Sequence, residues 1–351
     1  MPYAPMERDL TPDWILQQTL NVHNTALMSF LKDKQSEQND GTGGGLTLTV
    51  LGCGTMGIAI LGGILESLSS SNAQEADSEA PKRLPNKFNA CVRSSKGAER
   101  IKRELGRYER FKDVTIYQND NVKPSQDADV ILLGCKPYMI GPILKAEGMH
   151  DAVQGKLLIS ILAGVTEQSI QSSLPSADHS KVVRAMPNTA AAVRESMTVI
   201  ATSSPPLEDE TAALVDWIFT RIGRIVHLPS ANMDACTALC GSGPAFTALF
   251  LESLAAGAIA MGVPRDEAYL MAAQTARGTT QLMLKGGQDG GVEHPAVLRD
   301  KVSTPGGCTI GGLMVLEEGA VRGTVSRAVR EATVVASRLG SGATGVNGPR
   351  P

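Results

Sequence analysis

Short, continuously apolar segments alternate with helical patterns from residue 46 to about residue 229. A strand that is apolar on both faces must be covered on both faces, so this alternation is typical of a parallel sheet with helices on either side. We therefore predict an α/β fold with a doubly wound, mostly parallel sheet. The strands are expected at Leu46–Leu51, Phe88–Val92, Val114–Tyr117, Val130–Gly134, Leu157–Ile161, Lys181–Ala185, Thr198–Ala201 and Arg224–His227.

The pattern changes near Pro229–Ala231, where strand signals stop and helical ones dominate. An all-helical C-terminal domain is therefore expected at 230–340, after a sheet domain at 46–229. Pro244 and Pro264 are each expected at the first position of a long helix, with Ser242 as the cap before Pro244. The remaining helices are expected at His294–Val302, Ile310–Glu317 and Ala320–Leu339.

Both ends of the chain differ in composition from the middle. Residues 1–45 look like an N-terminal extension, with a helix from Thr11 to Phe30 and a polar, glycine-rich linker. Residues 69–86 form a polar loop insertion, and residues 341–351 a flexible tail. We predict four segments, namely 1–45, 46–229, 230–340 and 341–351.

Composition narrows the classes of function. The net charge is −3 and aromatic residues make up 4%, which argues against a nucleic-acid partner. No apolar run approaches the length of a membrane span, and no leader peptide is recognisable, so we expect a cytoplasmic protein that does not associate with membranes. None of the six cysteines forms a C-x-x-C pair, and no metal site is expected. Cys236 and Cys240 share a helix face, but without a nearby histidine packing is the better interpretation.

The first apolar strand runs directly into Gly52-Cys53-Gly54-Thr55-Met56-Gly57, a G-x-G-x-x-G match that opens a helix. This strand–turn–helix context is what a Rossmann-type dinucleotide site requires. Gly52 permits the tight turn, Gly54 lets the backbone approach a pyrophosphate, and Gly57 lets helix and strand pack closely. The cofactor residues expected at this loop are Leu51, Gly52, Gly54, Thr55, Met56 and Gly57.

The second strand ends in Arg93-Ser94-Ser95-Lys96, where NAD-preferring sites carry an acidic residue. Arg93 and Ser94 can bind a 2′-phosphate that an acid would repel, so we predict NADPH, with NADH as the alternative. Lys136, Pro137 and Ala163 follow later strands, and ligands of such sheets bind at the carboxyl ends of strands. We add these three to the expected cofactor site.

The segment Asp300-Lys301-Val302-Ser303-Thr304-Pro305-Gly306-Gly307-Cys308-Thr309-Ile310 separates two helical patterns. Hydroxyls, a proline and two glycines at the start of a helix leave backbone N–H groups available, which suits a small carboxylate. Together with the dinucleotide loop, the segment suggests a reductase that holds a small anion against a nicotinamide.

This segment resembles the signature of the pyrroline-5-carboxylate reductase family, and other stretches resemble the family in the same order. They are Gly52–Gly57, Lys136-Pro137, Ala163-Gly164-Val165-Thr166, Arg184-Ala185-Met186-Pro187-Asn188-Thr189 and Gly241-Ser242-Gly243-Pro244-Ala245-Phe246. The likeness covers roughly residues 46–339. It implies reduction of the cyclic imino acid 1-pyrroline-5-carboxylate to L-proline by NAD(P)H, the last step of proline synthesis. It also implies a Rossmann domain, a helical domain, and a homodimer or ring of dimers.

The resemblance also implies roles for single residues. The carboxylate would be held at Ser303, Thr304, Gly306, Gly307, Cys308 and Thr309. The catalytic residue would be Thr309, whose hydroxyl would hydrogen-bond the imine nitrogen, and Asn121 would lie near the adenosine ribose. His294 is interpreted as a helix-start residue. Two residues depart from the family pattern, because Cys308 replaces a small or hydroxyl residue and Ala190 replaces a proline.

Two other functions remain open. One is another reductase with a Rossmann and a helical domain, of the 3-hydroxyacid or ketopantoate type. Such enzymes need a catalytic lysine, and residues 230–300 offer Lys285 in a glycine-rich helix end. The other is a catalytically silent dinucleotide sensor, which would have no reason to retain Thr304–Thr309.

Overall fold

The computed structural model describes residues 44–69, 81–175, 180–287, 291–340 and residue 343. The chain divides into residues 1–45 and residues 46–351, and all the elements below belong to the second unit. The helix expected between Thr11 and Phe30, most of the loop insertion and nearly all of the tail lie outside the described residues.

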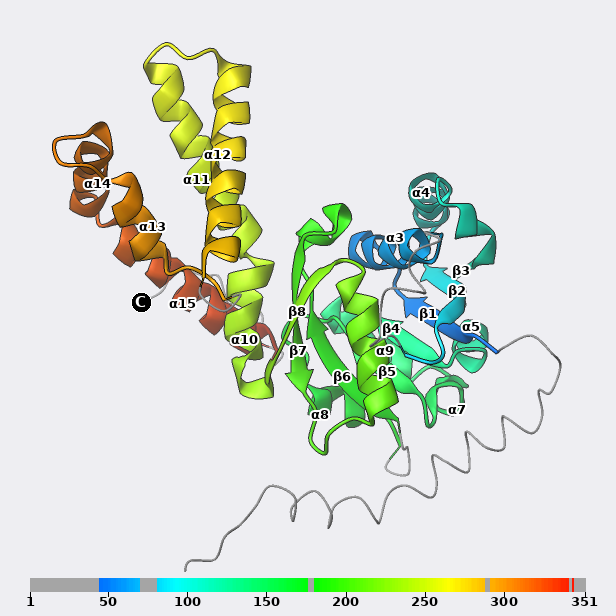
Figure 1. Ribbon diagram of the computed structural model, residues 1–351. Coiled ribbons are helices and arrows are strands. Elements are labelled where there is room, and N and C mark those ends of the chain that lie inside the picture. Colours follow the sequence, from blue (N-terminus) through cyan, green and yellow to red (C-terminus); the bar gives the residue numbers. More distant parts are fainter. Residues whose placement is uncertain (1–43, 70–80, 176–179, 288–290, 341–342, 344–351) are drawn as a thin grey trace, which may run out of the picture. The chain divides into compact units, whose positions relative to one another are not determined.

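An eight-stranded sheet runs through the first part of this unit in the order β3-β2-β1-β4-β5-β6-β7-β8 (Figure 1). Neighbouring strands are parallel except β6 and β7, which are antiparallel. Each predicted strand is present, and the predicted doubly wound fold is confirmed. The bounds are β1 Leu46–Leu51, β2 Pro85–Val92, β3 Val114–Gln118, β4 Val130–Leu133, β5 Leu157–Ser160, β6 Lys181–Met186, β7 Ser196–Thr202 and β8 Gly223–Pro229.

Helices cover both faces of this sheet because its strands are apolar on both faces. One core cluster joins the sheet to α3 (Thr55–Ser69), α4 (Ser95–Leu105) and α9 (Asp209–Thr220). A second cluster on the opposite face includes residues of α6 (Ile140–Leu144), α7 (Met149–Val153) and α8 (Glu167–Gln171). Short 3-10 helices are η1 Glu109–Asp113, η2 Pro137–Met139 and η3 Thr189–Val193.

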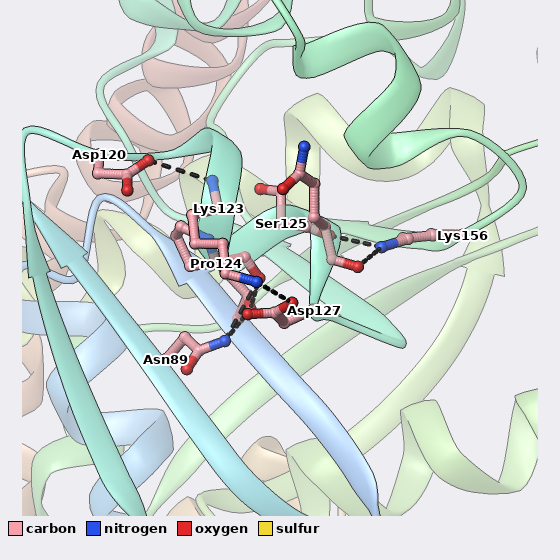
Figure 2. Close-up of polar contacts among 9 residues, drawn as sticks. Asn89, Asp120, Lys123, Pro124, Ser125, Asp127 and Lys156 are labelled. Carbon is pink, nitrogen blue, oxygen red and sulfur yellow. Dashed lines mark hydrogen bonds and ion pairs between the residues drawn. The ribbon is translucent and has the colours of Figure 1, made fainter. Parts of the chain in front are cut away.

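A buried polar network holds the short helix α5 (Val122–Gln126) against the sheet (Figure 2). The Asn89 side chain donates to the Thr49 hydroxyl at 3.0 Å, and that hydroxyl donates to the Pro124 carbonyl at 2.7 Å. Lys156 donates to the Ser125 and Gln126 carbonyls at the helix end. At the other end Asp120 accepts from the first two N–H groups of α5. These contacts fix the helix that starts next to Asn121.

The second part of the unit is helical, as predicted. It begins with η4 (Ser230–Asn232), α10 (Met233–Cys236) and the π-helical turn η5 (Thr237–Gly241). It continues through α11 Gly243–Ala260, α12 Arg265–Gly286, α13 Pro295–Val302, α14 Cys308–Glu318 and α15 Val321–Gly340.

The starts of the two long helices differ from the prediction. Ser242 is the N-cap of α11 as predicted, but its side chain makes no capping bond, because η5 ends at the residue before it; Pro244 is the second residue of α11 rather than the first. Pro264 is the N-cap of α12 rather than its first helical residue. The prediction for His294 is confirmed, since it is the N-cap of α13 and its Nδ1 accepts from the Ala296 N–H at 3.2 Å.

The helical part has a thin core of its own. Where α11 packs against α12, the buried residues are alanines at 255, 268 and 272. Many larger apolar side chains of these helices are exposed instead, among them Leu249, Phe250, Leu254, Leu270, Met271, Met314 and Val315. An apolar surface of this kind is unusual for a helical domain that exists as a monomer.

Candidate active site

The turn after β1 depends on glycine at its first position. Gly52 has a φ of +81°, and a Cβ atom there would lie 2.6 Å from the Cα of Cys135. Cys135 follows β4, which neighbours β1 in the sheet. The order of the strands reverses between β1 and β4, so the turn lies at the topological switch point where such sheets bind ligands.

The next two glycines have different surroundings. At Gly57 a Cβ would lie 2.9 Å from a Val50 methyl carbon, so only glycine allows α3 to pack this closely on β1. At Gly54 a Cβ would have only the Gly52 carbonyl oxygen within 4 Å, at 3.9 Å, so this part of the loop is open. The packing role predicted for Gly57 is confirmed, and the open space at Gly54 leaves room for the predicted approach of a phosphate. Thr55 and Met56 begin α3, whose free N–H groups suit an anion.

Two cysteines underlie the loop without being reactive. Cys53 and Cys91 are buried, and the Cys53 N–H donates to the Cys91 carbonyl at 2.8 Å. Burial raises the pKa of Cys53 to about 12, and burial also raises the pKa of Cys91. Both remain protonated thiols at neutral pH. Cys236 and Cys240 pack against Met233, as the packing interpretation predicted, and no metal-binding group occurs within the described residues.

A cavity of about 360 Å³ lies beyond the ends of β2 and β3. It brings together Arg93 and Asn121, which are far apart in sequence but were both predicted to contact the cofactor. Its lining includes three residues that the sequence analysis did not select, Val92, Asn119 and Tyr138. Asn119 has a positive φ of 56°, and Tyr138 is 76% exposed, as an aromatic platform for a ring would be.

The remaining predicted cofactor residues occupy strand ends. Leu51 is the buried last residue of β1, while Lys136 and Pro137 are exposed at the start of η2 after β4. Ala163 is exposed after β5. The Ser94 hydroxyl caps α4 by accepting from the Gly97 N–H at 3.2 Å, which leaves its proton available to a ligand.

The turn between α13 and α14 is held by hydrogen bonds within its own segment and depends on two glycines. Gly306 has a φ of +69°, and the Gly307 N–H closes the turn on the Thr304 carbonyl at 3.0 Å. A Cβ on Gly307 would collide with the Thr304 hydroxyl. Ser303 uses its N–H on Asp300 and its hydroxyl on Arg299, so in this conformation neither is directed at a ligand.

The first turn of α14 has the donors that the sequence predicted. Gly307 is the N-cap of α14 and has no side chain to accept a capping hydrogen bond. The backbone N–H groups of Cys308, Thr309 and Ile310 at the start of the helix therefore have no capping partner. Cys308 is exposed and Thr309 is half-buried. Among the described residues, no hydrogen bond joins the turn between α13 and α14 to the carboxyl ends of β1, β4 and β5, where the predicted cofactor residues lie.

A buried arginine that the sequence analysis did not select lies where β6 meets its neighbours. Arg184 is 5% exposed, and its Nη2 has no hydrogen-bond partner within the described part of the chain. Desolvation lowers its pKa, while the charges of Asp234 on α10 and Glu167 on α8 raise it. Only the motif Arg184–Thr189 pointed to this position, without indicating burial.

Comparison with known proteins places these features in a family. The model "Pyrroline-5-carboxylate reductase dimerisation" matches residues 230–339, and "NADP oxidoreductase coenzyme F420-dependent" matches residues 47–164. A pyrroline-5-carboxylate reductase of Lophium arboricola is 61% identical over 320 residues, which cover 88% of this chain and 98% of the relative. The chain belongs to the pyrroline-5-carboxylate reductase family. The reductase of Neurospora crassa is 52% identical over 326 residues, covering 87% of this chain and 96% of that protein.

Solved structures of the same family share the fold. A Plasmodium falciparum pyrroline carboxylate reductase with NADP bound has a TM-score of 0.67 at 25% identity, covering 84% of this chain and 98% of that one. The Coxiella burnetii enzyme has the same TM-score at 27% identity, with 84% and 99% covered. The family is one of oxidoreductases, and its dimerisation model covers the helices whose apolar side chains are exposed here.

One stretch of the reductase corrects the expectation about apolar runs. Ser230–Ala260 is long and apolar enough to cross a membrane by length and composition. An 18-residue window within it has a mean hydropathy of 1.4, and only 6% of that window is buried. The expectation missed it because alanines and glycines separate its large apolar residues. The dimerisation model covers the same stretch, so a subunit interface accounts for the apolar surface.

Proposed function

We propose that this chain reduces 1-pyrroline-5-carboxylate to L-proline with NAD(P)H, the last step of proline biosynthesis. The observation that carries the proposal is the family match at 61% identity over 88% of the chain. Two features of the structure support it: the turn after β1 is open at Gly54, and the start of α14 has no side-chain cap. The 3-hydroxyacid alternative is disfavoured because Lys285, its candidate base, lies in the last turn of α12.

The substrate carboxylate binds at the start of α14. The N–H groups of Cys308 and Thr309 head an uncapped helix, where the helix dipole favours an anion. Thr304 and Gly306 shape the approach, because Gly306 has a positive φ and Thr304 is held against Gly307. Ser303 and the Gly307 N–H support the turn through their hydrogen bonds rather than through the ligand.

When bound, NADPH would supply the hydride that reduces the imine carbon, and the ring nitrogen of the product would carry a proton. The Thr309 hydroxyl hydrogen-bonds that nitrogen and orients the ring. No general acid of the protein is required, because the imine arrives protonated or takes its proton from water. The protein therefore contributes orientation and electrostatics.

The residues at the switch point would hold the cofactor. The open turn at Gly54 and the first N–H groups of α3 would bind its pyrophosphate, and the cavity of Arg93, Asn121 and Tyr138 would take its adenosine end. Arg93 makes NADPH the preferred cofactor, since a guanidinium pairs with a 2′-phosphate. The Arg93→Asp variant should shift the ratio of kcat/KM values from NADPH toward NADH. An unchanged ratio would remove Arg93 from this role.

The reductase is oligomeric, and we propose a homodimer or a ring of dimers. The exposed apolar side chains of α11, α12 and α14 are then covered by a second copy rather than by a membrane.

The test is NADPH oxidation with 1-pyrroline-5-carboxylate and, in parallel, with 3-hydroxyacids assayed in the oxidative direction with NADP⁺. The imine should be reduced and the hydroxyacids should be poor substrates. Equal rates with both would contradict the specific assignment. Binding of NADPH without turnover of any of them would indicate a dinucleotide sensor instead.

A further inference from the structure

A basic groove of about 330 Å³ runs along one face of α3. Its apolar lining comes from Ile58, Ala59 and Leu105 among others. On one side, two arginines three residues apart share a face of α4, and the turn that follows α4 supplies a third. On the other side η3 and the residue after it supply a further one. The four are Arg100, Arg103, Arg107 and Arg194.

The carboxylates nearby do not neutralise this charge. Arg100 and Arg103 share one oxygen of Glu104, at 2.8 and 3.4 Å, and Arg194 pairs with Glu66 at 2.8 Å. Arg107 makes no ion pair among the described residues. Four guanidinium groups therefore face two carboxylates, which leaves two positive charges in excess.

A tyrosine holds two of the arginines in place. The hydroxyl of Tyr108 accepts from Arg107 at 2.8 Å and from Arg194 at 2.9 Å. Gly62 leaves room for this arrangement, because a Cβ there would be in tight contact with it, 3.2 Å from the Tyr108 oxygen and 3.4 Å from an Arg194 nitrogen. At the far end Arg100 donates to the Thr55 hydroxyl at 3.1 Å. The guanidinium groups at the two ends are thus oriented before any ligand arrives.

The groove is distinct from the cavity proposed for adenosine. The two share no lining residue, since one is formed by α3, α4 and η3 and the other lies beyond the ends of β2 and β3. The groove does adjoin the dinucleotide loop at Thr55, which is one of its lining residues, so the test is made with the dinucleotide site filled. Arg100 and Arg103 are like charges three residues apart on α4 and share the single carboxylate of Glu104, so a further anion in the groove would stabilise them.

We propose that this groove binds a phosphate-bearing small molecule other than the dinucleotide. A phosphate dianion matches the two excess charges, and guanidinium groups bind phosphate oxygens through two parallel hydrogen bonds. The apolar lining accommodates the uncharged part of such a molecule, and the volume is in the range of small-molecule sites. The ligand class is a phosphate ester of nucleotide size.

The experiment measures binding of inorganic pyrophosphate and of ATP to the full-length protein saturated with NADPH, by isothermal titration calorimetry. Saturation keeps the dinucleotide site occupied, so its contribution is excluded. The variant is Arg103→Gln/Arg107→Gln. The matched control is Lys102→Gln/Lys112→Gln, which removes the same charge from exposed lysines of α4 and η1 that do not line the groove.

The wild-type protein should bind one ligand per chain, and the arginine variant should bind at least tenfold more weakly. The lysine control should remain within twofold of wild type. Three results would overturn the proposal: no binding to the NADPH-saturated protein, simple competition with NADPH, or equal weakening in both variants. Because turnover is not measured, the outcome is independent of the proposed reductase activity.

Discussion

Two glycines of the same loop test what the backbone contributes at the level of single residues. Gly52→Ala places a methyl group 2.6 Å from the Cys135 backbone at a positive φ, so the free energy of unfolding should fall by about 2 kcal/mol or more. Gly54→Ala meets only open space and should change it by less than about 0.5 kcal/mol. Its effect should appear in NADPH affinity instead.

Urea unfolding and NADPH titration of both variants separate the two roles. If Gly54→Ala bound NADPH as tightly as wild type, the pyrophosphate would not approach the loop there. If Gly52→Ala had the same free energy of unfolding as wild type, the closeness of Cys135 would not be what requires glycine at residue 52.

Substitution of Thr309 tests the proposed role of its hydroxyl in the reaction. Its hydroxyl is half-buried, and no hydrogen bond to it is found among the described residues, so Thr309→Ala should leave the fold intact. Losing a hydrogen bond that acts on the reacting imine should cost about 2–4 kcal/mol in the transition state, by analogy with oxyanion donors. We expect kcat to fall by a corresponding factor of about 30 to 1,000. Thr309→Ser should restore most of it, and an unchanged rate in Thr309→Ala would exclude the role.

At the scale of elements, the sequence predicted what periodicity can encode. The strands were correct because an apolar run such as Val130–Leu133 has few alternatives inside an α/β chain. The short helices α5 to α8 were not assigned, since five residues are too few to show a helical period. The turn η5 was missed because Ser242 and Pro244 look like a helix start, while the preceding helical turns supply the backbone partners instead.

The candidate site was predictable to a similar degree. Glycines that carry a backbone requirement, such as Gly52 and Gly57, were found from their spacing. Tyr138 and Arg184 were not, because exposure in a cavity and burial against a distant helix depend on tertiary contacts. The engagement of Ser303 within α13 also needed coordinates, since a hydroxyl before a helix looks the same whether or not it is already bonded.

The packing of α8, which carries Glu167, against β6, which carries Arg184, predicts a pH dependence. Burial raises the pKa of Glu167 above its usual 4.5, although the charge of Arg184 lowers it. A carboxyl whose pKa is higher in the folded than in the unfolded state stabilises the fold while it is protonated. Its contribution to the free energy of unfolding is lost as pH rises from 4.5 through the raised pKa. In Arg184→Met the pKa of Glu167 should rise further, so the loss should extend to higher pH.

Urea unfolding between pH 4 and 8 measures this difference. Arg224→Met is the matched control, because Arg224 is an exposed arginine on β8. A pH profile of Arg184→Met parallel to that of the control would show that Glu167 does not respond to Arg184.

For the whole molecule, the exposed apolar face of the helical part is the dominant feature. Phe250 and Leu254 are 46% and 45% exposed and lie one turn apart on α11. Burying such a side chain contributes about 1.5–3 kcal/mol, so placing two charges there should dissociate the oligomer. Sedimentation of Phe250→Glu/Leu254→Glu should show a smaller species than wild type. Val193→Glu, a charge at an exposed residue outside the dimerisation region, should sediment like wild type.

The central claim is that the start of α14 holds the substrate carboxylate beside the nicotinamide. A crystal structure with NADPH and a carboxylate-bearing proline analogue tests it most directly. The account predicts the analogue carboxylate within about 3.2 Å of the Cys308 or Thr309 N–H, with the ring between Thr309 and the nicotinamide. An analogue bound with its carboxylate on other groups, away from this turn, would contradict it.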